Sequence, residues 1–96
     1  MEQLIGPVHP GEHLVEFLDD FGITQYRLAK EIHVPARRVN EIVLGRRGIS
    51  ADSALRLARF FGTTPDFWMN LQDKYELEMA RAKSGEEIQR SITGLA

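Results

Sequence analysis

The chain has 96 residues, of which 43% are hydrophobic and 27% charged, with no cysteine and a formal net charge of −2 at pH 7. A chain of this length forms one domain with a modest core, and its apolar runs fall far short of the roughly 20 residues that a membrane-spanning helix needs. The absence of cysteine excludes disulfides and thiolate metal ligands, and the N-terminal segment lacks the basic and apolar regions of a secretory signal. These features predict a single cytoplasmic domain.

Capping and turn residues divide the chain into short helical segments, and no stretch shows the alternation typical of a strand. Pro10 suits the first turn of a helix, and apolar residues then recur at helical spacing until Gly22, which predicts a helix over residues 10–21. Thr24 is a good N-cap for a second helix over residues 25–32. The sequence therefore predicts an all-α fold from its first elements onward.

Two more helices follow in the middle of the chain. Pro35 sets the backbone for a third helix over residues 36–44, which Gly45 ends. Ser50 caps a fourth helix, which runs to Gly62. Both segments place apolar residues on one face, as expected for helices that pack against a shared core.

The threonine and proline at 64–65 repeat the pattern of a cap followed by proline, so a fifth and longest helix should start there and run to about Lys83. The sequence thus predicts an N-terminal arm over residues 1–8 and a five-helix domain over residues 9–83. Residues 84–96 are expected to form a tail that frays or depends on a partner for its structure.

Charge is segregated along the chain. Residues 23–60 contain eight Lys or Arg and three acidic residues, a local charge of +5, whereas the rest contains four and eleven, a charge of −7. Four arginines fall within RRVNEIVLGRR, residues 37–47. A basic middle region is typical of binding to a polyanion such as DNA, and a solvated helical face is the simpler alternative.

The second and third predicted helices are joined by about three residues, which is typical of a helix-turn-helix whose second helix enters the DNA major groove. If Val39 and Ile42 face the core, the opposite side of the third helix faces outward. Arginine can bond guanine and asparagine can bond adenine bidentately, whereas arginines in the following loop suit phosphates.

The residues of this region therefore form two sets of predicted DNA contacts. The predicted base contacts are Ala36, Arg37, Asn40 and Glu41. The predicted phosphate contacts are Gln25, Arg38, Arg46 and Arg47. For Glu41 two roles stay open, because its carboxylate could accept from cytosine or orient an arginine.

Three segments, HPGEHLVEFL, TQYRLAKEI and NEIVLGRRGISADSALRLARFFGTTPDFWMNLQ, carry a resemblance that extends from about His9 to Tyr75. Over them the chain resembles the Xre/Cro-like (lambda-repressor-like) helix-turn-helix proteins, and more closely the HigA antitoxin group, also called virulence-associated protein I. The resemblance implies a homodimeric repressor of its own operon. It further implies binding and neutralisation of a HigB-type toxin, a ribosome-dependent mRNA endonuclease, with no cofactor and no catalytic residue.

Two residues depart from the usual pattern of this group. His33 stands where such turns often have glycine, and histidine is among the residue types enriched at positive φ. Pro35 stands where serine is common, so the third helix is expected to lack a side-chain cap. The recognition helix is therefore expected to begin within one residue of position 36.

Several alternatives stay open at this stage. HPGEH has the H-x-x-E-H spacing of inverzincin metalloproteases, but Pro10 and Gly11 between the ligands favour His9 as a residue that precedes the helix, so no metal is expected. Two other hypotheses are a helical protein-interaction domain without DNA binding and a stand-alone Xre-type regulator.

Partner surfaces are predicted with alternatives of their own. A symmetric operator requires a two-fold dimer, and the fifth helix offers an apolar face that is either core or interface. The predicted dimer residues are Trp68, Met69, Leu71 and Tyr75. Acidic residues that could meet a basic toxin, or form solvated faces, are Glu12, Glu16, Asp19 and Asp20 near the N-terminus, and Asp73, Glu76 and Glu78 on the fifth helix.

Overall fold

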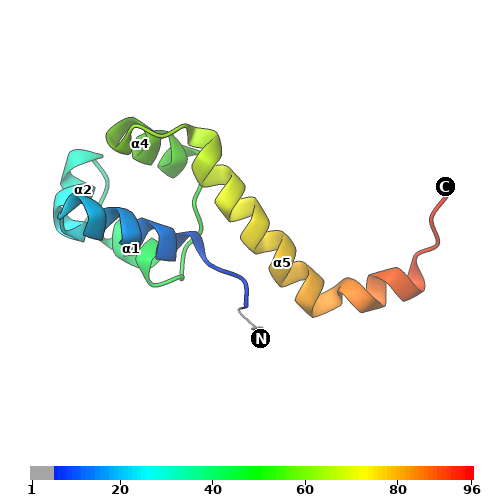
Figure 1. Cartoon of the computed structure of the whole chain (residues 1–96). Helices are drawn as coiled ribbons and strands as arrows, with labels where there is room; N and C mark the ends of the chain where they lie inside the picture. Colours follow the sequence, from blue (N-terminus) through cyan, green and yellow to red (C-terminus); the bar gives the residue numbers. More distant parts are fainter. Residues whose placement is uncertain (1–5) are drawn as a thin grey trace.

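The computed structural model describes residues 6–96, which form five α-helices and no strand. The helices are α1 (Pro10–Phe21), α2 (Gln25–Glu31), α3 (Ala36–Val43), α4 (Ala51–Phe61) and α5 (Pro65–Ser91). Figure 1 shows α1 to α4 gathered in one compact unit, from which α5 leads away until the C-terminus lies far from the other helices. The predicted all-α, five-helix class is confirmed, while residues 1–5 of the predicted arm lie outside the described residues.

The helix starts follow the predicted caps. The hydroxyls of Thr24, Ser50 and Thr64 accept hydrogen bonds from backbone N–H groups three residues further on, at 3.0 to 3.1 Å. Pro35 precedes α3 without a side-chain cap, as predicted. The boundaries agree to within one residue for α1 to α4, because local capping chemistry decides where these helices begin and end.

The core lies where α1, α2, α3, α4 and the start of α5 meet. Its largest fully buried side chains include Leu14, Leu28, Ile42, Leu57 and Trp68. The helices α1 and α3 approach so closely that a Cβ added at Gly11 would lie 2.0 Å from the carbonyl oxygen of Ile42. Glycine at this position is therefore a requirement of the packing between α1 and α3.

The prediction that the fifth helix ends near Lys83 is wrong, because α5 continues to Ser91. Ser84 and Gly85 do not break it, since a single glycine within a helix costs only about 1 kcal/mol. The added turns carry their own local support, in which Arg90 pairs with Glu87 at 3.0 Å. A signal for a longer helix was present in the good helix formers after Gly85.

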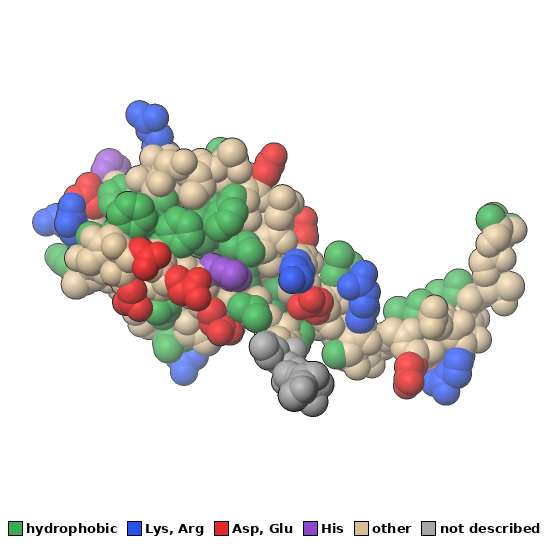
Figure 2. All heavy atoms as spheres, in the orientation of Figure 1, with side chains coloured by type: hydrophobic (Ala, Val, Ile, Leu, Met, Phe, Trp, Pro, Cys, Tyr) green, Lys and Arg blue, Asp and Glu red, His purple; other side chains and the backbone are tan. Residues whose placement is uncertain are grey.

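Only Trp68 and Gln72 of α5 are buried, so the distal part of this helix has no packed face within the described chain. Figure 2 shows it projecting from the compact unit as a separate arm. No helix of the described residues is both long and apolar enough to cross a membrane.

Candidate nucleic-acid interface

The turn between α2 and α3 is built around a left-handed residue. His33 has φ of 61°, a region in which histidine is among the enriched residue types, and it is the only non-glycine residue with positive φ among the described residues. The N–H of His33 donates to the carbonyl of Lys30 at 3.3 Å, and that of Val34 donates to the carbonyl of Ala29 at 3.0 Å. These bonds close the end of α2 and direct the chain into α3, which is the geometry of a helix-turn-helix.

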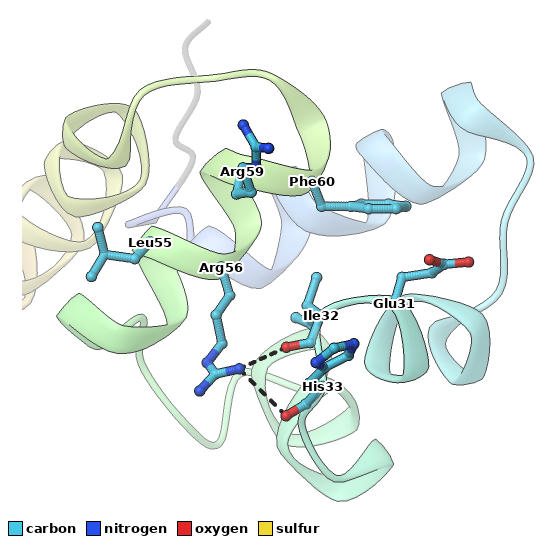
Figure 3. A pocket seen from close by; sticks show the side chains of 7 residues that line it. All are labelled: Glu31, Ile32, His33, Leu55, Arg56, Arg59 and Phe60. Atoms are coloured by element: carbon cyan, nitrogen blue, oxygen red, sulfur yellow. Dashed lines mark hydrogen bonds between the residues drawn. The ribbon is translucent and has the colours of Figure 1, made fainter.

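Arg56 of α4 holds this turn in place, and it is not among the residues predicted from the sequence. Its guanidinium donates to the carbonyl oxygens of Ile32 and His33 at 2.8 and 3.4 Å (Figure 3). A single oxygen of Asp52, Oδ2, accepts from Nε of Arg56 at 2.9 Å and from Nη1 of Arg38 at 2.7 Å. The i, i+4 spacing of Asp52 and Arg56 was the one signal in the sequence that could have revealed this pair.

An open groove of about 540 Å³ lies beside this anchor. It lies between the α2–α3 turn and α4 (Figure 3), and its lining includes Leu55, Arg59 and Phe60 of α4. The two arginines that hydrogen bond Asp52 hold the pKa of its carboxyl below the usual range, so the anchor is ionised at neutral pH. The groove thus borders the helix-turn-helix without forming part of the exposed face of α3.

The outward face of α3 carries the predicted base contacts. Ala36, Arg37 and Asn40 are exposed there, and the side chain of Arg37 is 85% exposed. The amide of Asn40 donates to the side-chain oxygen of Gln25 at 3.1 Å, which joins α3 to the first residue of α2. The structure therefore places these predicted base and phosphate contacts next to each other.

Glu41 lies between two arginines. Its Oε2 accepts from Nε of Arg37 at 2.9 Å, and its Oε1 accepts from Nε and Nη2 of Arg47 at 2.9 and 2.7 Å. These hydrogen bonds, from Arg47 first and Arg37 second, lower the pKa of the Glu41 carboxyl. Of the two roles predicted for Glu41, the contacts favour orientation of arginines over contact with a base.

The remaining predicted phosphate contacts differ in their freedom. Arg38 has a side chain only 28% exposed and is held by Asp52. Arg46 is exposed, and within residues 6–96 no carboxylate lies within ion-pair distance of it. The backbone N–H groups of Arg46 and Arg47 donate to the carbonyl of Glu41 at 2.8 and 3.2 Å, so the loop is fixed to the end of α3.

His9 precedes α1, as predicted from HPGEH. Its Nδ1 accepts from the N–H of Gly11 at 2.9 Å, and its ring meets that of Tyr75 edge-on at 4.9 Å. Burial lowers the pKa of His9, against smaller opposing effects of Glu12 and of a backbone hydrogen bond with Arg47. The neutral ring serves as the N-cap of α1, and residues 6–96 contain no group of three His, Asp or Glu arranged to hold a metal.

The predicted dimer residues fall into two kinds. Trp68 is fully buried within its own chain and donates from Nε1 to the hydroxyl of Thr63 at 2.8 Å, so its assignment to a dimer interface is corrected to the core. Met69 and Leu71 are partly buried against the same core. Tyr75 is also partly exposed and contacts His9. Met69, Leu71 and Tyr75 therefore stay predicted dimer contacts.

Two helices joined by a fixed turn, with an exposed second helix and a basic loop after it, define a helix-turn-helix domain of the DNA-binding type. The helix-turn-helix family model matches residues 14–68. Virulence-associated protein I of Dichelobacter nodosus is 50% identical over 74 residues, which are 76% of this chain and 68% of that protein. The chain belongs to the helix-turn-helix family, within its group of HigA-type antitoxins and virulence-associated protein I.

Solved structures agree with this assignment. A HigA-family addiction module antidote protein from Coxiella burnetii has a TM-score of 0.91 at 49% identity, covering 94% of this chain and 99% of that one. The Pseudomonas aeruginosa antitoxin HigA, solved with the higBA promoter, has a TM-score of 0.90 at 49% identity with the same coverage. The whole fold, including α5, is therefore shared with these proteins.

Proposed function

We propose that this protein is a DNA-binding antitoxin that represses its own operon. The observation that carries the proposal is the outward face of α3, where Arg37 and Asn40 are exposed beside the basic loop that holds Arg46. The similarity to the HigA antitoxin solved with its promoter supports the same use of this face. In the proposed complex α3 lies in the major groove of operator DNA.

In this proposal the residues of that face have different roles in binding bases and phosphates. Arg37 and Asn40 carry the donor and acceptor groups that distinguish guanine and adenine edges, whereas Arg46 meets a phosphate. Glu41 holds Arg37 and Arg47 in defined orientations before DNA arrives, which lowers the conformational entropy lost on binding. Gln25 aligns the amide of Asn40 from α2.

The proposed DNA-binding form is a homodimer, because a two-fold symmetric operator requires two recognition helices about 34 Å apart. Met69, Leu71 and Tyr75 of α5 are the proposed contacts between subunits. We also propose, from the similarity to HigA antitoxins, that the chain binds and neutralises a HigB-type toxin. A stand-alone regulator would share the DNA contacts and lack this partner.

Fluorescence anisotropy with the chain's own upstream promoter and a scrambled duplex, repeated across salt concentrations, tests the DNA function. Arg37→Ala should reduce the preference for the promoter, and Arg46→Ala should weaken both duplexes and reduce the salt slope by about one. Arg90→Ala, which alters an exposed arginine near the end of α5, is the matched control and should change neither. Equal weak binding of both duplexes by the wild-type chain would contradict the proposal.

A further inference from the structure

An aromatic cluster reaches the surface where α1, α4 and α5 meet. The ring of Phe17 on α1 lies 5.0 Å from that of Phe61 on α4 and 5.8 Å from that of Phe67 on α5. Phe21 adds a ring 5.4 Å from Phe61 and is 60% exposed. The fully buried Trp68 packs beneath, 5.0 Å from Phe17. The cluster is thus an extension of the core that meets solvent.

Four carboxylates border this cluster along α1, a helix that contains no Lys or Arg. Their spacing of i, i+4, i+7 and i+8 places them on one side of the helix, and all four residues are exposed. They are Glu12, Glu16, Asp19 and Asp20. Figure 2 shows acidic side chains along one border of the hydrophobic group on this face. We call the four carboxylates together with Phe17, Phe21, Phe61 and Phe67 the acidic aromatic surface.

The charges of this surface are almost unpartnered within residues 6–96. Two histidines lie near carboxylates of the stripe. Nδ1 of His13 is 3.9 Å from Glu16, and this ring is charged only when protonated. Glu12 raises the pKa of His9, but burial lowers that pKa by more, so the His9 ring is neutral. Like charges four residues apart on a helix repel. Asp19 and Asp20 also lie in the last turn of α1, where the helix dipole disfavours negative charge.

The unpartnered carboxylates and the exposed ring of Phe21 are therefore both unfavourable for the isolated chain. A lysine in place of Asp20 would suit the end of α1, and a polar residue in place of the exposed Phe21 would avoid hydrating an aromatic ring. Positions at which a sequence gives up local stability without recovering it elsewhere in the fold are expected at functional surfaces. A partner that supplies cations and apolar contacts would offset the charge repulsion and the exposure of the aromatic ring together.

We infer that the acidic aromatic surface is the docking site for the toxin, an inference that rests on the proposed antitoxin function. The resemblance to HigA antitoxins implies a toxin that acts on mRNA, and such a protein presents Lys and Arg toward the phosphate backbone. Such side chains pair with carboxylates and also lie favourably over aromatic faces. The basic face of α3 would repel the same partner, which leaves α3 free for DNA. Charge alone would also fit the acidic residues of α5, and the exposed phenylalanine rings beside the α1 carboxylates favour α1.

The test is calorimetric titration of the full-length chain with a catalytically inactive form of the HigB-type toxin of the same operon. The double variant Glu16→Lys and Asp20→Lys should weaken toxin binding about tenfold. The loss of affinity relative to the wild type should be larger at low salt than at high salt. The same variant should melt at a higher temperature than the wild type, because repulsion and the dipole conflict are removed. A merely structural role for these carboxylates would not lower toxin affinity while raising thermal stability.

The control is Glu86→Lys with Glu87→Lys, which makes the same change in net charge at exposed positions of α5 outside the predicted toxin contacts. The toxin affinity of this control should stay within about twofold of the wild-type value. The promoter affinities of the two double variants, which carry the same net charge, should lie within about twofold of each other. Phe21→Ala probes the aromatic part and should weaken toxin binding about fivefold, with promoter binding retained.

The outcomes separate the two levels of the hypothesis. Toxin affinity that is unchanged in the α1 variant, or lost only in the α5 control, overturns the docking site and leaves the antitoxin function standing. A wild-type chain that binds its promoter but not the toxin overturns the toxin partner itself and the docking site with it. Loss confined to the α1 double variant and Phe21→Ala supports both.

Discussion

Two charged faces of this molecule, one formed by α3 with its following loop and the other by α1, differ in how their charges are partnered. On the first, Glu41 holds two arginines and Asp52 holds two more, so most cations have a fixed position. On the second, four carboxylates share one stripe with no Lys or Arg on the helix and two histidines nearby. Fixed charges suit readout of a rigid duplex, whereas unpartnered charges leave free energy to be gained from a binding partner.

The largest effect is expected where the two faces are joined. Gly11→Ala places a Cβ 2.0 Å from the carbonyl oxygen of Ile42, and because backbone must move to admit it, the free energy of unfolding should fall by about 3 kcal/mol or more. Chemical denaturation measures the change. Gly85→Ala is the control, since its added Cβ meets only Arg81 at an ordinary 3.7 Å and should stabilise α5 by about 1 kcal/mol or less.

A smaller loss is expected from the anchor of the helix-turn-helix. Arg56→Ala removes hydrogen bonds to the carbonyls of Ile32 and His33, so the free energy of unfolding should fall by about 1–2 kcal/mol. Arg59→Ala, at the edge of the same groove, should change it by less than about 0.5 kcal/mol. Equal effects of the two variants would show that Arg56 acts only as a surface charge.

The sequence was informative wherever local chemistry decides the outcome. Thr24, Ser50 and Thr64 mark the helix starts, and His33 shows the positive φ that its position required. Sequence patterns failed where tertiary contacts decide. Nothing in the spacing of Arg56 reveals that the α2–α3 turn lies against it.

The candidate site shows the same division. Helical periodicity predicted that Arg37 and Asn40 face outward, and both are exposed. It could not assign Glu41 between its two possible roles, because the second arginine comes from a loop whose path depends on the fold. Trp68 was ambiguous between core and interface for a related reason, since an apolar stripe does not state which neighbour buries it.

Removing the carboxylate that fixes the arginines should make the first face resemble the second in having unpartnered charge. Glu41→Gln frees Arg37 and Arg47, so binding to the scrambled duplex should strengthen about threefold while the preference for the promoter falls. Anisotropy at two salt concentrations measures both. Glu31→Gln, whose carboxylate lies 3.7 Å from Arg27 on α2, is the control and should leave the preference intact.

Acid should distinguish the partnered carboxylates. Hydrogen bonds from Arg56 and Arg38 depress the pKa of Asp52 in the folded protein, so its stabilising contribution is present above the unfolded-state pKa and is lost as the pH falls through the folded-state pKa. Asp52→Asn should therefore flatten the acid side of the stability curve measured by thermal melts. A wild-type slope retained in this variant would exclude Asp52 as its source.

The smallest effect concerns the turn that orients the first face. Since His33 has φ of 61°, His33→Gly relieves the strain of a left-handed residue but adds conformational entropy to the unfolded chain, so the net gain in stability should be under about 1 kcal/mol. His33→Ala keeps the strain and should melt below His33→Gly, which isolates the backbone term from the loss of the imidazole. If the glycine variant melts at or below the temperature of the alanine variant, strain at this φ does not limit the stability of the turn.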